Sequence, residues 1–168
     1  MMVWFDHCAR LCAVAILALL TTACAATGPS YTQMQQSPGT LESGHARLYF
    51  MRGSDLVNAA LVARVHIDGM KVANLKMGGF FFTDHPAGQV KIMIDAPLNF
   101  GEAKQLFEAE SGKTHYFVVD NNMGNVLVGS LFGARGTLRS SDGRFTFRPI
   151  PEAEGLNNLK TMKFSGSQ

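Results

Sequence analysis

Short runs in which apolar and polar residues alternate, separated by turn residues, extend from residue 45 to about residue 150. In the runs "HARLYFMR", "LVARVHI" and "VKIMI" every second residue is apolar, which is typical of β-strands with one buried face. The inward-facing residues predicted by this alternation are Ala46, Leu48, Phe50, Leu61, Ala63, Val65, Ile67, Val90, Ile92 and Ile94. The pattern therefore predicts a domain built from short strands.

Turns that contain glycine separate these strands. The pair "DG" at residues 68–69 predicts a tight turn into "KVANL", and "HPAG" turns the chain into "VKIMI". A second "DG", at residues 142–143, predicts a hairpin formed by "TLRSSDGRFTFRPI", with Phe145 and Phe147 pointing inward. The regular spacing of turns favours antiparallel connections.

Two runs are apolar on both faces. "HYFVVD" predicts a central strand covered on both sides. In "GGFFF", Phe80 and Phe82 fall on one side of a strand and Phe81 on the other. We expect both sides to be covered, and the alternative is that Phe81 belongs to an exposed patch for a partner.

Two further segments complete the fold prediction. "GEAKQLFEAES" has the composition of a short helix, but the turn "SGK" that follows favours one arm of a hairpin, and we expect a strand. "PEAEGLNNLK" predicts a short C-terminal helix that begins at a proline. The fold class is therefore all-β: an antiparallel β-sandwich, Ig-like or PEGA-like, of about seven to nine short strands with a C-terminal helix.

The first 26 residues differ from the rest in composition. Arg10 is their only strong base, "LCAVAILALL" is apolar, and "TTACAA" supplies small side chains, as in a secretory signal peptide. The apolar run is too short to span a bilayer, which takes about 20 residues. We expect export from the cytoplasm.

Two cleavage sites compete in this segment. "TTAC" is similar to the end of a bacterial lipoprotein signal, in which the thiol of Cys24 receives a diacylglyceryl group, although Thr21 stands where leucine is usual. Ordinary cleavage after Ala25 is the alternative. Cys8 and Cys12 are removed in either case, so Cys24 would be the sole cysteine and could form no intramolecular disulfide. We favour lipidation of Cys24.

These signals divide the chain into four parts. Residues 1–23 form the removed signal peptide, and residues 24–44 the lipidated cysteine with a flexible linker rich in Gly, Pro, Ser, Thr and Gln. Residues 45–150 form the sandwich, and residues 151–168 a helix and tail.

Several classes of function are disfavoured. The formal net charge of +2 is too small and dispersed to indicate nucleic-acid binding. No nucleophile elbow or zinc-protease motif is present, and the histidines have no metal-ligand spacing, although His66 and Asp68 share a strand face. We expect no enzymatic activity, no cofactor and no metal.

Arginines in the last predicted hairpin are the candidate binding residues. They are Arg135, Arg139, Arg144 and Arg148. Their guanidinium groups suit phosphate or carboxylate groups of lipid headgroups, lipid A or peptidoglycan. The alternative is that they form the solvated face of an amphipathic hairpin.

"ARLYFMR" and "VHIDGMKVANLKMGGFFFTDHPAG" resemble a family of short bacterial lipoproteins whose domain has no assigned function. The matching positions include Arg52, Val65, Ile67, Asp68, Gly69, Val72, Leu75, Gly79, Phe81 and Gly88. The middle of the chain is also similar to PEGA-type β-sandwich domains. The resemblance implies fold and anchoring, and it implies no catalytic residues. The run at residues 86–89 lacks a histidine that the family often has there.

These observations together predict a lipid-anchored bacterial envelope protein with a non-enzymatic β-sandwich that serves as an interaction or structural module. The residue after the cysteine is Ala25 and not aspartate, which resembles the pattern in lipoproteins that are sorted to the outer membrane. We therefore expect the protein at that membrane, with the domain facing the periplasm. A soluble periplasmic protein is the alternative location. The alternative function is binding of an anionic envelope component by the arginine hairpin, and the expected partners are the membrane and an envelope protein, glycolipid or peptidoglycan.

Overall fold

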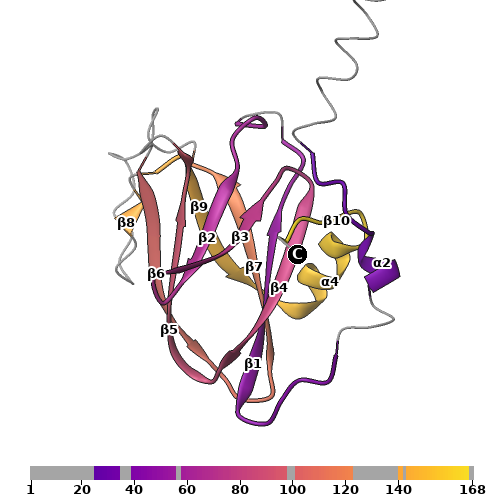
Figure 1. Cartoon of the computed structure of the whole chain (residues 1–168), viewed down its shortest axis with the longest axis vertical. Coiled ribbons are helices and arrows are strands. Elements are labelled where there is room, and N and C mark those ends of the chain that lie inside the picture. Colours follow the sequence, from indigo (N-terminus) through magenta and orange to yellow (C-terminus); the bar gives the residue numbers. More distant parts are fainter. Residues whose placement is uncertain are drawn as a thin grey trace, which may run out of the picture.

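The computed structural model describes residues 25–34, 39–55, 58–97, 101–122, 140–141 and 143–166. In this part of the chain, two five-stranded sheets face each other (Figure 1). The first sheet has the order β10 (Lys163–Phe164), β4 (Gly79–Pro86), β1 (His45–Arg52), β7 (Thr114–Asn121) and β9 (Phe145–Ile150). The second has the order β3 (Met70–Leu75), β2 (Ala63–Ile67), β5 (Gly88–Asp95), β6 (Glu102–Ala109) and β8 (Ser140–Ser141). The predicted β-sandwich is confirmed.

The main core lies between the two sheets and consists of the residues that alternation placed inward. Ala46, Leu48 and Phe50 of β1 are fully buried there. The ring of Phe50 stacks on Phe81, with centroids 5.1 Å apart, and on Phe117 at 5.0 Å. Burial of each such side chain contributes about 1.5–3 kcal/mol to folding.

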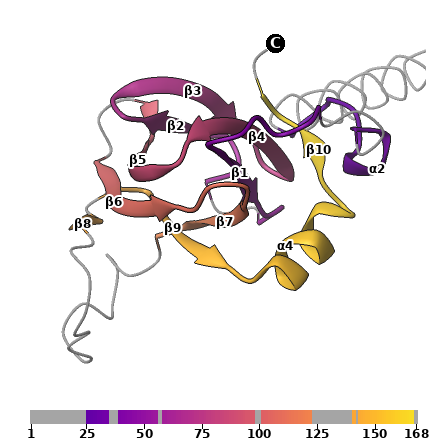
Figure 2. The ribbon, with the colours of Figure 1, turned by 90° about the horizontal axis from the view of Figure 1, so that it is seen from below.

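A second apolar cluster covers the outer face of the first sheet. The helices α2 (Tyr31–Met34) and α4 (Glu152–Leu159) lie against this face, on the side where β10 forms the edge of the sheet (Figure 2). The buried members of the cluster are Tyr31, Tyr49, Met51, Phe80, Tyr116, Ile150 and Leu159. Both sides of "GGFFF" and of "HYFVVD" are therefore covered, as predicted.

Close approach of α4 to the sheet depends on a glycine. A Cβ atom at Gly155 would stand 2.5 Å from the ring of Tyr116. The glycine that weakens the helix by propensity thus lets the helix lie directly on an aromatic ring.

Only some of the expected hairpins form. The turn at residues 68–69 joins β2 and β3 as predicted, and residues 102–109 form strand β6 rather than a helix. The turn after β6 does not make a hairpin, because β6 pairs with β5 while β7 pairs with β1 in the other sheet. That part of the prediction is wrong.

The predicted hairpin around residues 142–143 is wrong for the same reason. Strand β8 pairs with β6 of the second sheet, whereas β9 pairs with β7 of the first. Phe145 and Phe147 nevertheless point inward, with 1% and 2% of their surface exposed. Two strand pairs, β1 with β7 and β10 with β4, are parallel, and the remaining pairs of the described strands are antiparallel.

Residues 25–34, part of the segment expected to be a flexible linker, pack against the folded domain. The Ala26 amide donates to the Met77 carbonyl at 3.0 Å, and the Tyr31 amide donates to the Met162 carbonyl at 3.3 Å. The ring of Tyr31 meets the ring of Phe80 edge to face, with centroids 5.6 Å apart. One aromatic side chain in a polar segment thus attaches the segment to the domain. In the described part of the chain, no helix has the length and apolar character that a membrane span requires.

Candidate functional site

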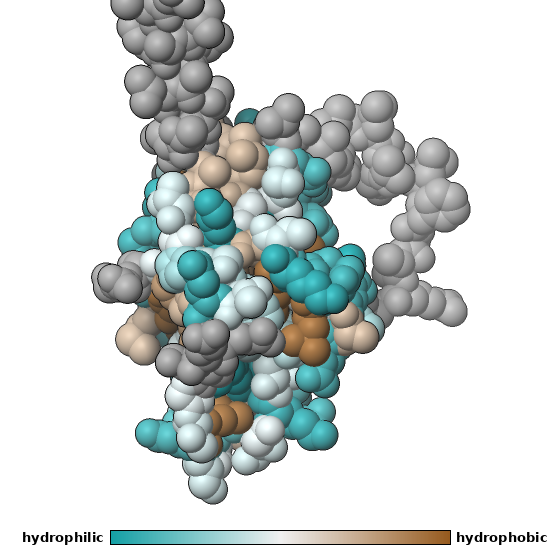
Figure 3. Space-filling view, turned by 90° about the vertical axis from the view of Figure 1, so that its right-hand side faces the viewer, coloured by the Kyte–Doolittle hydropathy of each residue, from teal (hydrophilic) through white to brown (hydrophobic). Residues whose placement is uncertain are grey.

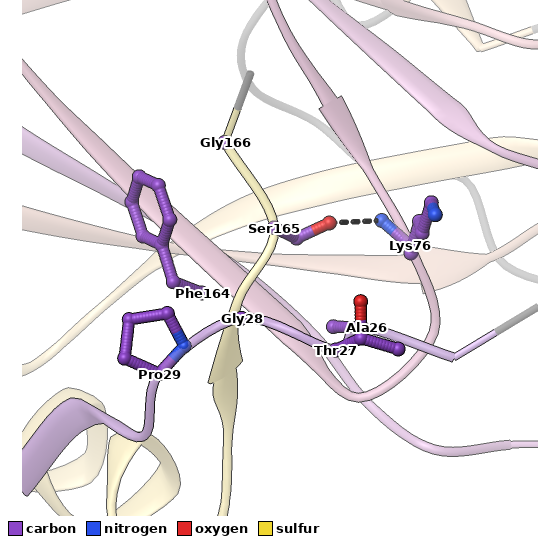
Figure 4. Close-up of a pocket in the computed structure, with 8 residues that line it drawn as sticks. All are labelled: Ala26, Thr27, Gly28, Pro29, Lys76, Phe164, Ser165 and Gly166. Carbon is purple, nitrogen blue, oxygen red and sulfur yellow. Dashed lines mark hydrogen bonds between the residues drawn. The ribbon is translucent and has the colours of Figure 1, made fainter. Parts of the chain in front are cut away.

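A pocket of about 390 Å³ opens between the two ends of the described chain (Figure 4). The pocket is lined by Ala26, Thr27, Gly28, Pro29, Lys76, Phe164, Ser165 and Gly166. Its volume falls in the range of small-molecule sites, about 300–1,000 Å³. The residues that line the pocket come from three segments that are far apart in the sequence.

Backbone hydrogen bonds hold the two terminal segments side by side. The Gly28 amide donates to the Phe164 carbonyl at 3.2 Å, and the Phe164 amide donates to the Pro29 carbonyl at 2.8 Å. A Cβ atom at Gly28 would stand 2.3 Å from the Phe164 carbonyl oxygen, so only glycine fits at this approach.

Ser165 links both sheets beside the pocket. Its amide donates to the Phe80 carbonyl of β4 at 2.7 Å. Its hydroxyl donates to the Asn74 carbonyl of β3 at 3.0 Å and accepts the Lys76 amide at 2.8 Å (Figure 4). Through its backbone amide and its hydroxyl, this one residue thus connects a strand of the first sheet with a strand of the second.

Lys76 supplies the positive charge of the pocket. Lys163 lies close to it, because Lys163 pairs with Gly79 and the Gly79 amide donates to the Lys76 carbonyl. Among the described residues, neither lysine has a carboxylate within 4.0 Å. The surface on the side of α2 and α4 is mostly polar, with smaller apolar areas between the polar groups (Figure 3).

The residues predicted as sites are only partly described. Cys24, Arg135 and Arg139 lie outside the described residues. Arg144 is exposed just before β9, where its carbonyl accepts the Asn122 amide at 2.9 Å. Arg148 is on β9, so the structure places two of the four arginines in one strand region.

Carboxylates surround Arg148. Its Nε lies 3.9 Å from Asp120 Oδ2, and its Nη2 lies 3.4 Å from Glu154 Oε1. Burial raises the pKa of Asp120, and the positive charge of Arg148 opposes that rise. An anion that bound Arg148 would compete with these two acids.

Two other arginines, on β1, have structural roles that the sequence did not indicate. Arg47 binds Asp84 through two hydrogen bonds of 2.7 Å. Arg52 is 3% exposed, and it donates to the carbonyls of Leu61 at 2.5 Å and Asn58 at 2.8 Å. Burial lowers the pKa of Arg52 to about 10, which leaves it charged at neutral pH.

The histidines contact separate partners. His66 Nε2 lies 3.4 Å from Asp95, and His85 Nε2 lies 3.1 Å from Asp68. His66 and Asp68, which share a strand face in the sequence pattern, therefore pair with different groups. Across the residues that the structure describes, no three side chains of His, Cys, Asp or Glu are grouped to hold a metal ion.

Sequence reasoning missed the pocket because its lining comes from both ends of the chain. Tyr31 was the available signal, since it is an aromatic residue in an otherwise polar segment, and aromatic side chains gain much from burial. Most of the lining, apart from Lys76, belongs to segments that were interpreted as linker and tail.

Comparison with known proteins adds one finding on identity. The profile of a family described as proteins of unknown function, DUF2846, matches residues 42–131. The match contains strands β1 to β7 and includes Lys76 but not the terminal segments of the pocket. No curated protein and no solved structure matches the chain. Because the matched region covers more than half of its length, this chain belongs to the DUF2846 family of proteins of unknown function.

Proposed function

We propose that this protein is a lipid-anchored protein of the bacterial envelope whose β-sandwich is a non-enzymatic interaction module. Cys24 carries the lipid, and the domain faces the periplasm from the outer membrane. The observation that carries the proposal is the run "LALLTTAC", an apolar segment that ends on the cysteine after small residues.

The position of the first described residues supports a role for this cysteine. Ala25, which follows Cys24 directly, forms a β-bridge with Met77. A lipid on Cys24 would therefore hold the folded domain at the membrane surface. Stable anchoring takes more than one acyl chain, which a diacylglyceryl group supplies.

The chemistry of the charged and phenolic groups supports a non-enzymatic module. Arg47 and Arg64 are held in two-bond ion pairs with Asp84 and Asp95 of neighbouring strands. Burial raises the pKa of Tyr49 to about 12, so its phenol stays protonated. These groups hold strands together and are poor acids or bases near neutral pH.

We do not extend the proposal to anion binding by the arginines near β9. Arg148 is already in contact with Asp120 and Glu154. Two carboxylates near one guanidinium offset part of its positive charge, which makes Arg148 a weaker site for a further anion.

Intact mass tests the proposal. The full chain is expressed in a Gram-negative host and purified from the membrane fraction, beside Cys24→Ser and Cys12→Ser variants. We expect wild type and Cys12→Ser to have the mass of residues 24–168 plus a diacylglyceryl group, with or without an N-acyl chain. Cys24→Ser should lack the lipid. A wild-type mass that begins at Ala26 without lipid would overturn the proposal.

A further inference from the structure

We propose that the end of the sandwich bearing the terminal pocket rests on the membrane, with Lys76 and Lys163 in contact with phosphates of phospholipid headgroups. This inference rests on the proposed lipidation of Cys24. It adds an orientation: one defined end of the domain faces the bilayer, and the opposite end faces the aqueous compartment.

The first step is the distance from the anchor to the folded domain. Consecutive Cα atoms are about 3.8 Å apart, so the Cα of Cys24 lies that close to Ala25. Ala25 is fixed to Met77 by its bridge, and the next residue, Ala26, is buried. A free linker of 20 residues would instead have a reach of roughly 25 Å. The docked segment thus removes most of the freedom of the anchored domain.

The second step is which end of the sandwich the anchor reaches. Met77 lies in the connection between β3 and β4, and the Gly78 amide donates to the Gly53 carbonyl, just after β1. At the opposite end of β1, the carbonyl of its first residue, His45, accepts the Gly112 amide. The turn between β6 and β7, at residues 110–113, therefore lies at the opposite end of the sandwich from Ala25 and Met77. Figure 1 shows this turn at the end where β1 begins.

The third step is the charge at the anchored end. Lys76 lines the pocket together with Ala26. Lys163 of β10 pairs with Gly79 and directly precedes Phe164, which also lines the pocket. Neither lysine is neutralised by a carboxylate of the described residues. Each lysine near an anionic leaflet strengthens contact about fivefold. The open pocket beside Lys76 gives a headgroup phosphate room to approach the ammonium group.

Alternative occupants of this end fit the position less well. A soluble ligand in the pocket would have to enter next to an acylated residue, where lipid headgroups are at high local concentration. Shielding of the pocket by a second protein molecule would not depend on anionic lipid, so the experiment distinguishes it from contact with phosphates.

Thiol labelling of the lipidated full chain tests the orientation. In the lipidated protein Cys24 is a thioether and the other two cysteines have been removed, so an introduced cysteine is the sole thiol. Thr27→Cys, at an exposed position of the pocket, reports the anchored end, and Glu110→Cys reports the far end. Each introduced cysteine is labelled with a fluorophore. A water-soluble quencher then measures how exposed the fluorophore is when the protein is bound to vesicles of phosphatidylethanolamine with a smaller share of phosphatidylglycerol.

We expect the label at residue 27 to be shielded and the label at residue 110 to be open to the quencher. Lys76→Gln with Lys163→Gln should weaken the contact about 30-fold and expose residue 27. The matched control, Lys71→Gln with Lys91→Gln, removes the same charge away from the anchored end and should leave residue 27 shielded. Vesicles of phosphatidylcholine alone should also expose residue 27.

Failure of the two proposals would look different. A purified protein without lipid by mass would overturn the anchor and the orientation together. A lipidated protein with residues 27 and 110 equally exposed would overturn the orientation alone. Shielding of residue 27 that persists in phosphatidylcholine, or that survives removal of both lysine charges, would overturn the contact with phosphates.

Discussion

Arg52 holds its guanidinium over the ring of Phe145, with Cζ 4.6 Å from the ring centroid. The same side chain donates hydrogen bonds to the backbone that connects β1 with β2, at Asn58 and Leu61. A cation at the end of β1 thus binds the connection that runs from the first sheet to the second, and it packs on a ring of β9. These hydrogen bonds of Arg52 go to backbone carbonyl groups and not to a carboxylate.

Arg52→Met should lower the free energy of unfolding by about 2–3 kcal/mol, because buried carbonyls would lose a charged donor. Urea denaturation at pH 7 measures the change. Lys71→Met on the exposed part of β3 is the control and should stay within about 0.5 kcal/mol of wild type. An Arg52→Met protein as stable as wild type would contradict the structural role of the guanidinium.

Gly155→Ala should destabilise the protein by about 1–3 kcal/mol, because the new methyl group meets the ring of Tyr116. Helix propensity alone predicts the opposite sign, a gain of about 1 kcal/mol. Asn157→Ala, at an exposed position of α4, is the control and should be neutral or slightly stabilising. Thermal and urea unfolding distinguish the two expectations, and a more stable Gly155→Ala protein would rule out the close contact.

Tyr31→Ala should detach residues 25–34 from the domain and lower stability by about 2–3 kcal/mol. Tyr31 is 8% exposed and meets the rings of Tyr49 and Phe80. Limited proteolysis should then cut this segment faster than in wild type, whereas Thr32→Ala, at an exposed position of α2, should leave the rate unchanged. Equal cleavage in both variants would show that the ring does not hold the segment.

The stability of the domain should depend on pH through the protonation of His115. Burial lowers the pKa of His115, against the nearby Glu110 carboxylate, which raises it. The Glu110 amide also donates to His115 Nε2 at 3.1 Å, which requires the unprotonated nitrogen. The neutral ring therefore stabilises the folded state above the unfolded pKa of about 6.5, and this stabilisation is lost as the pH falls through the folded pKa.

Urea unfolding at pH 7.5 and at pH 5.5 measures this dependence. The wild-type protein should lose more stability between the two conditions than His115→Gln, whose side chain does not titrate. The same pH dependence in both proteins would assign the effect to other groups.

Local sequence patterns predicted which residues face inward but not which sheet a strand joins. Alternation is a property of a few neighbouring residues, so Phe50 and Phe81 could be placed without knowledge of the fold. The turn after β6 contains Gly112 at φ +72°, a conformation that serves a hairpin and a crossing between sheets equally well. The choice between the two depends on pairing with β5 and β1, which lie elsewhere in the sequence.

The candidate site was less accessible to sequence reasoning than the fold. Its lining depends on backbone bonds between Gly28 and Phe164, and no local pattern links these two residues. Polar, glycine-rich composition correctly indicates weak intrinsic structure, but one docked ring such as Tyr31 is enough to override it. The sequence offered Arg148 as a candidate binding residue, whereas its pairing with Glu154 depends on the position of α4.

The bonds from Gly28 and Tyr31 to Phe164 and Met162 also set an order of events during synthesis of the chain. The ribosome makes Tyr31 early and Met162 among the last residues, so the early segment cannot complete its docking until the final strand has emerged. A chain released before Met162 would lack β10 and leave this segment without its partners, even with the other strands of both sheets formed.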